Sequence, residues 1–140
     1  MLKKSIPLLI LFLILSSCDL FKTQNTEDLP LLNINWELVS FNYFHRLPIH
    51  VNSGEFTILF SDTGTVQSKV DCNQCFGEFT LGDQKSISIQ LQACTEVACL
   101  DSKDNEFHEA IRNTTRYTID EDRLRLYFDN NYLYFLSKPD

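Results

Sequence analysis

The sequence lacks an apolar run long enough to cross a membrane. Its longest apolar run, residues 6–15, is interrupted only by Pro7, and as a helix it would span about 15 Å of a hydrocarbon core about 30 Å thick. Positive charge is also scarce, because 12 Lys and Arg residues face 19 Asp and Glu residues, which argues against nucleic-acid binding. No glycine-rich phosphate loop and no serine–histidine pattern is apparent, so we expect neither an enzyme nor a bound cofactor.

The N-terminus has the features of an export signal. Lys3 and Lys4 form a short basic region before the apolar run, and the run ends in LSSC at residues 15–18. This ending resembles the lipobox of bacterial lipoproteins, in which the cysteine becomes the acylated first residue of the mature chain. The resemblance implies that residues 1–17 are a signal peptide and that Cys18 carries palmitate, with more than one acyl chain for stable anchoring. We therefore expect a lipid-anchored protein on the periplasmic or surface face of the bacterial cell envelope.

The rest of the chain divides into a tether and one domain. Residues 18–32 are mostly polar and show no sustained period, so we expect a tether between the lipid and a domain of residues 33–137. Within this domain, apolar residues alternate with polar ones in several short stretches, which is the pattern of half-buried strands. The alternating apolar positions are Trp36 and Leu38; Phe56, Ile58 and Phe60; Val66 and Val70; Phe79 and Leu81; Ile87, Ile89 and Leu91; Tyr117 and Ile119; Leu124, Leu126 and Phe128; and the run 132–136.

One segment has a helical period instead. Phe107, Ala110 and Ile111 follow the i, i+3, i+4 spacing of one helix face, and acidic residues precede them where they suit the helix dipole. The sequence therefore predicts a mainly β fold, a small antiparallel barrel of about eight strands with one α-helix within residues 102–114. Four aromatic residues are assigned to the barrel core in preference to a ligand surface, and they are Phe128, Tyr132, Tyr134 and Phe135.

With Cys18 assigned to lipid, four cysteines remain in the domain. Cys72 and Cys75 have the CxxC spacing, and Cys94 and Cys99 are separated by four residues. An even number of cysteines in an exported domain favours disulfides. A zinc ribbon would need the CxxC spacing in both pairs, and a thioredoxin-type motif would begin a helix, whereas Cys75 leads into a strand pattern. We therefore expect disulfides and no metal.

The histidines have no metal-ligand spacing with one another. His108 begins a sequence similar to the HExxH zinc motif, but Arg112 stands where the second histidine is required. We predict that His108 lies on a solvated face of the helix.

Several short motifs resemble those of META domains, the family that includes the HslJ-type heat-inducible lipoproteins. The residues that carry the resemblance are Cys72, Asn73, Gly77, Glu78 and Phe79; Thr95, Ala98 and Cys99; Glu106, Phe107 and Ile111; Trp36 and Leu38; and Leu124 and Leu126. The differences are Asp71, Phe79 and Val97, which replace the family's usual glycine, tyrosine and methionine. The resemblance implies a small barrel-like META/HslJ fold with one helix, no catalytic activity, and a link to envelope stress or drug tolerance.

The resemblance also implies how the cysteines pair. Cys72 and Cys99 fall in two of the family motifs and are expected to form one disulfide, which leaves Cys75 and Cys94 as an additional pair. The two pairs are nested, as two rungs across neighbouring antiparallel segments would be. A local bridge between Cys72 and Cys75 is the main alternative.

The resulting hypothesis is a non-catalytic, lipid-anchored META-domain protein of the bacterial envelope that acts by binding. Its expected partners are the membrane, through the N-terminal lipid, and an unidentified envelope protein or small ligand, with the chain itself a monomer. The alternative is a lipocalin-like carrier, since a barrel of about eight strands holds either one small apolar ligand or side chains alone. The outer membrane is the favoured location, although Asp19 after the lipidated cysteine favours inner-membrane retention in enterobacteria.

Overall fold

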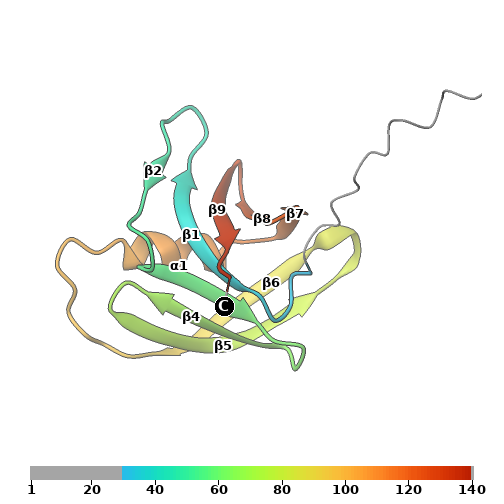
Figure 1. Cartoon of the computed structure of the whole chain (residues 1–140), viewed down its shortest axis with the longest axis horizontal. Helices are drawn as coiled ribbons and strands as arrows, with labels where there is room; N and C mark the ends of the chain where they lie inside the picture. Colours follow the sequence, from blue (N-terminus) through green and yellow to red (C-terminus); the bar gives the residue numbers. More distant parts are fainter. Residues whose placement is uncertain (1–29, 140) are drawn as a thin grey trace, which may run out of the picture.

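The computed structural model describes residues 30–139 of the chain (Figure 1). The predicted signal peptide, Cys18 and most of the predicted tether lie outside the described residues. No helix in the described part of the chain is long and apolar enough to span a membrane. The strands of this part form one antiparallel sheet, against which an α-helix packs.

The elements follow one another with short connections. In chain order they are β1 (Asn35–Asn42), β2 (Ile49–His50), β3 (Phe56–Phe60), β4 (Thr65–Val70), β5 (Asn73–Leu81), the 3-10 turn η1 (Asp83–Lys85), β6 (Ile87–Cys94), α1 (Asp104–Arg112), β7 (Arg116–Asp120), β8 (Arg123–Phe128) and β9 (Asn131–Ser137). The sheet order is β6-β5-β4-β3-β1-β9-β8-β7, and β2 adds only to β1. All neighbouring strands are antiparallel, so the fold consists of two meanders joined where β9 pairs with β1.

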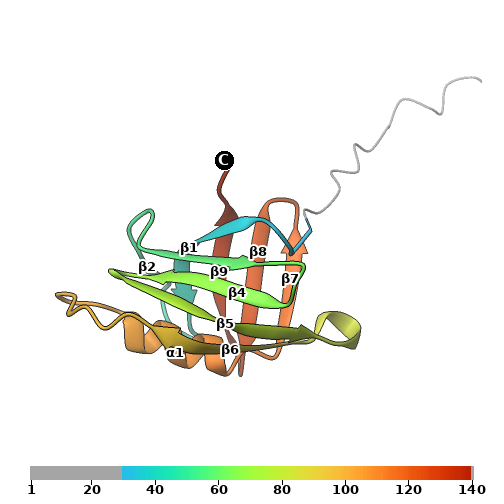
Figure 2. The same cartoon turned by 90° about the horizontal axis from the view of Figure 1, so that it is seen from below.

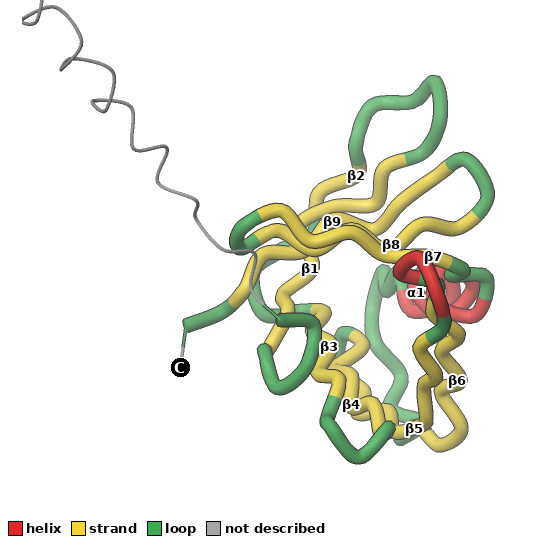
Figure 3. The backbone as a smooth tube through the Cα atoms, turned by 90° about the vertical axis from the view of Figure 1, so that its right-hand side faces the viewer, coloured by secondary structure: helices red, strands yellow, loops and turns green. Residues whose placement is uncertain are grey.

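The sheet curls so that its two end strands, β6 and β7, approach each other (Figures 2 and 3). At one end they meet, because Ser86 and Arg116 form a β-bridge and the Ile87 N–H donates to the Thr115 carbonyl at 3.0 Å. Farther along β6, α1 takes the place that β7 would occupy in a closed barrel (Figure 3). The fold is therefore a half-barrel completed by a helix, which confirms the predicted mainly β class and leaves part of β6 with a neighbouring strand, β5, on one side only.

Large apolar side chains fill the inside of the curled sheet. The largest are Trp36, Phe41, Phe56, Phe60, Phe107 and Phe135, each with at most 2 % of its surface exposed. The strand positions among them belong to the inward-facing half of an alternating pattern, as the hydrophobic periodicity predicts. The helix adds Phe107, Ala110 and Ile111 from one face, so tertiary packing rather than intrinsic propensity holds this short helix in place.

The helix Asp104–Arg112 lies within the predicted segment 102–114, and two other details differ from the sequence prediction. Leu31, which was assigned to the tether, is only 5 % exposed and its carbonyl accepts a hydrogen bond from the Trp36 indole, so the packed domain begins before residue 33. Tyr132 and Tyr134 lie half-buried on the outer face of β9, because an extended strand sends only every second side chain inward.

Candidate binding site

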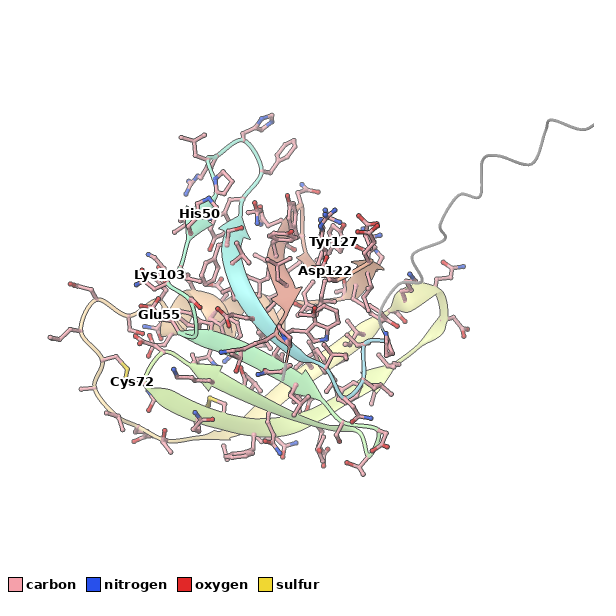
Figure 4. The ribbon with its side chains drawn as sticks, viewed as in Figure 1. His50, Glu55, Cys72, Lys103, Asp122 and Tyr127 are labelled. Atoms are coloured by element: carbon pink, nitrogen blue, oxygen red, sulfur yellow. A yellow bond between two sulfur atoms is a disulfide. The ribbon has the colours of Figure 1, made fainter. Side chains whose placement is uncertain are left out.

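Two disulfides join the start of β5 to the end of β6 and the loop after it. Cys75 and Cys94 are directly opposite each other on β5 and β6, with Cα atoms 4.1 Å apart. Cys72, labelled in Figure 4, precedes β5 and is bonded to Cys99 across a Cα–Cα distance of 6.1 Å. These are the two pairs expected from the family resemblance, and Cys72 does not bond to Cys75.

The Asn73 side chain fixes the loop that follows β6. It is buried, and its Oδ1 accepts hydrogen bonds from the Val97 N–H at 2.7 Å and from the Thr95 hydroxyl at 2.9 Å. Its Nδ2 donates to the Val97 carbonyl at 3.1 Å. One side-chain amide thus pairs with both backbone groups of a loop residue, as a neighbouring strand would. The structure gives Asn73, Thr95 and Cys99 one common role, which is to hold this loop against β5.

Gly77 in β5 and Asp71 in the turn before β5 have backbone positions that restrict which residue can stand there. Gly77 lies next to a bulge in the pairing of β5 with β6, and a Cβ atom at this position would overlap the Gln90 carbonyl oxygen. Asp71, which replaces the family's glycine, has φ = 56°, a left-handed conformation that Asp tolerates better than most residues do.

Glu106 is exposed in the first turn of α1, where its charge suits the helix dipole, and it lies apart from the cysteines.

His108 lies beside the Cys75–Cys94 disulfide instead of on a fully solvated helix face. Its Nε2 is 3.9 Å from each of the two sulfur atoms. Burial is the main cause that lowers the pKa of His108. The charge of Asp104 opposes this shift and that of Arg112 reinforces it, and the net direction is downward. The imidazole is therefore neutral at pH 7. Sequence reasoning missed the contact because no spacing rule connects a helix residue to cysteines 33 and 14 positions earlier.

A groove runs between the outer edge of β6 and one side of α1. It encloses about 320 Å³, and its lining consists of Ser88, Ile89, Gln90, Leu91, His108, Ile111 and Arg112. A second hollow of about 650 Å³ shares Ser88 and Arg112 with the groove and reaches the turn between β5 and β6. The groove was not predicted from the sequence, since it exists only because the curled sheet brings β6 beside α1 (Figure 2).

The backbone groups of Ile89 and Leu91 point away from β5, on the side of β6 where the groove lies. Ile87 donates its N–H outward to the segment before β7, and alternate residues of a strand direct their N–H and C=O groups to the same side. In agreement, Phe79, the partner of Ile89 on β5, donates its own N–H away from β6. No other described residue hydrogen-bonds the outward groups of Ile89 and Leu91, but Ile89 as a whole residue is only 2 % exposed because α1 packs against β6. The accessible part of this unpaired sheet edge is therefore at Leu91, which is half-buried.

A positive charge stands beside the free edge. Arg112 is the last residue of α1 and lines both hollows, and it forms no salt bridge within residues 30–139. A guanidinium group binds carboxylates well because its planar fork donates two parallel hydrogen bonds. The groove therefore offers backbone hydrogen bonds to an extended chain and a paired contact to an anionic group.

The fold and sequence have counterparts among known proteins. The model of a family described as "META domain" matches residues 29–140. The crystal structure of a DUF4847 family protein from Bacteroides vulgatus ATCC 8482 is similar, with a TM-score of 0.61 and 19 % sequence identity, covering 79 % of this chain and 96 % of that one. At this identity the likeness concerns the fold alone. No protein of curated function matches the sequence.

Proposed function

The chain belongs to the META domain family, and we propose that it is a lipid-anchored envelope protein that binds a partner and catalyses no reaction. The anchor is supported by the lipobox-like sequence that ends at Cys18. The binding site is the groove between β6 and α1, and the unpaired edge of β6 at Leu91 is the observation that carries the proposal. A role in envelope stress or drug tolerance, as implied by the family resemblance, would then depend on such binding.

The occupant that we propose is an extended, acidic peptide segment of another envelope protein. A peptide strand laid along the outer edge of β6 would hydrogen-bond to the outward N–H and C=O groups of Leu91, the accessible part of that edge, which is recognition by strand addition. Its side chains would meet α1 on the other side of the groove, where Arg112 is placed to bind a carboxylate. Backbone pairing would supply affinity, and the arginine would favour acidic segments over others.

The interior of the half-barrel gives less support to a lipocalin-like carrier. A carrier needs an apolar cavity inside the barrel, and a barrel of about eight strands has room for either a small ligand or side chains. Here Trp36, Phe60 and Phe135 are fully buried at its centre, and each has 0 % of its surface exposed. The free edge on the surface therefore favours binding in the groove over binding in the interior.

Photo-crosslinking from Gln90 should capture the partner. Gln90 lines the groove from β6, so a benzophenone amino acid at this position should form covalent adducts with envelope proteins in intact cells. The matched control is the same replacement at Gln67, an exposed glutamine on β4, which has a strand on either side and no free edge. Adducts are measured as shifted bands on denaturing gels and identified by mass spectrometry.

The result should depend on the charge of the groove. Arg112→Glu in the Gln90 background should remove most of the adduct, because the reversed charge repels an acidic segment. The identified segment, made as a peptide, should then slow amide hydrogen exchange at Leu91 in the purified protein. Equal labelling from Gln90 and Gln67, or no labelling from Gln90, would contradict the proposed site.

The lipid anchor is tested separately by metabolic labelling with radioactive palmitate. Wild-type protein should carry the label and fractionate with membranes, and Cys18→Ala should lose the label because the acylated thiol is absent. Cys99→Ser serves as the control, since loss of this cysteine leaves the lipobox intact. The anchor would be refuted by an unlabelled wild-type protein or by a Cys18→Ala variant that is processed like the wild type.

A further inference from the structure

Cys75, Cys94 and His108 form a cluster of three metal-ligating side chains. Their ligand atoms all lie within 4.8 Å of one another, although the two cysteines are bonded to each other in this structure. Cys75 is fully buried, Cys94 is exposed, and His108 lies between these extremes. The cluster brings together β5, β6 and α1, and the other disulfide, Cys72–Cys99, does not belong to it.

The position of His108 fits a zinc site closely. In a tetrahedral site with Zn–S bonds of about 2.3 Å and Zn–N bonds of about 2.0 Å, a sulfur and a nitrogen ligand are roughly 3.5 Å apart, and two sulfurs roughly 3.8 Å. Both Sγ–Nε2 distances are already 3.9 Å. Only the two sulfurs must separate, and reduction allows this because non-bonded sulfurs repel each other at a disulfide distance.

The imidazole also has no competing partner. Within the described residues the His108 side chain makes no hydrogen bond other than its contacts with the two sulfurs, and it forms no salt bridge. A histidine that only filled space beside a disulfide would not need Nε2 at equal distances from both sulfur atoms. The geometry is that of a ligand facing a two-cysteine site.

We propose that Cys75, Cys94 and His108 form a redox-gated binding site for Zn²⁺ or a similar thiophilic cation, closed as a disulfide and open as a dithiol. A dithiol of an envelope oxidoreductase attacks the exposed Cys94 sulfur, so that two electrons and two protons pass to the cysteines and the dithiol becomes a disulfide. Zn²⁺ then displaces both thiol protons and is bound by two thiolates and Nε2. A water molecule completes the four ligands.

The test is a metal titration of the purified chain in the reduced and the oxidised state. After reduction with a phosphine, which does not compete as a thiol ligand, the protein should bind one Zn²⁺ per chain in competition with a chromophoric chelator. Cd²⁺ should give the ultraviolet charge-transfer band of thiolate ligation. The oxidised protein should show neither binding nor band, because disulfide sulfurs are not thiolate ligands.

Variants assign the site to these three residues. Cys72→Ser with Cys99→Ser should retain the metal, and Cys75→Ser with Cys94→Ser should lose it. His108→Gln should weaken binding roughly 10- to 100-fold or more, since even loss of an outer partner of a ligand has such an effect. His45→Gln, on the loop between β1 and β2, is the matched control and should bind as the wild type does.

His108→Gln keeps the test decisive if a cysteine variant fails to fold, because it leaves both disulfides available and replaces a partly exposed helix residue. The proposal is overturned if His108→Gln binds Zn²⁺ as tightly as the wild type. It is equally overturned if the oxidised protein binds the ion with the same stoichiometry, or if binding requires Cys72 and Cys99 in place of Cys75 and Cys94. The outcome does not depend on whether the groove binds a peptide.

Discussion

Replacing Gly77 with alanine should lower the free energy of unfolding by about 3 kcal/mol, at the upper end of what overpacking costs in a well-packed interior. The added methyl group would overlap the carbonyl of Gln90 and lie 2.8 Å from the Leu91 Cα, and both of these belong to backbone. Backbone cannot rotate away as a side chain can, so β5 and β6 must move apart at their bulge. Urea denaturation followed by circular dichroism measures the loss as a lower transition midpoint.

Gly82→Ala is the matched control for this change. At Gly82 the added methyl group would meet the Ser86 hydroxyl, the end of a short side chain that can adopt another rotamer. We expect a change within about 0.5 kcal/mol, as for most surface substitutions. Equal stability of the Gly77→Ala and Gly82→Ala variants would show that β5 and β6 are not held together as closely as the structure has them.

The strand pattern could be predicted because one face of the sheet is buried and the other is not. Ile87 and Ile89 of β6 alternate with polar residues, and they are 4 % and 2 % exposed. Leu124 and Leu126 of β8 follow the same rule and are fully buried. A buried face imposes a period of two on the sequence, and this local period identifies the strand without knowledge of its neighbours.

The alternating pattern predicts neither which strands pair nor the groove between β6 and α1. Alternation at Ile89 shows that its side chain is buried, but it does not show that its backbone groups have no partner on one side. His108 occupies an ordinary helical position, and only the closure of the half-barrel by α1 brings it to the sulfurs. Sites built from segments distant in sequence leave no local period, and here both candidate sites are of this kind.

Departures from the family motifs are easier to interpret with the structure. Asp71 stands where the family motif has a glycine, and its φ of 56° places it in the left-handed region, which glycine adopts more readily than other residues do. Asp can adopt it at a modest cost, because its short polar side chain tolerates the left-handed region. Asp71 therefore fits the left-handed position in the turn between β4 and β5 that precedes Cys72.

Removal of the Asn73 side chain should have the second large effect. Asn73→Ala would remove both hydrogen bonds between the Asn73 amide and the backbone of Val97. It should cost about 1–3 kcal/mol, since a hydrogen bond contributes about 0.5–1.5 kcal/mol net and the freed groups of the exposed Val97 can bind water. Hydrogen exchange at the Val97 amide should become faster by more than the global loss explains, because the loop opens locally while the Cys72–Cys99 bond still tethers it. Both quantities are measured on the oxidised protein.

Two variants separate the hydrogen bonds of Asn73 from the general effect of losing an asparagine. Asn73→Asp keeps the acceptor for the Val97 N–H but, when ionised, places a second negative oxygen against the Val97 carbonyl, so it should destabilise the protein more at pH 7 than in acid. Asn105→Ala, on the exposed surface of α1, should be neutral or slightly stabilising, because alanine has the higher helix propensity. Asn73→Ala could instead unfold at the wild-type urea midpoint, with an unchanged rate of amide hydrogen exchange at Val97. The two disulfides alone would then hold the loop, and the hydrogen bonds of the Asn73 side chain to Val97 would not contribute to stability.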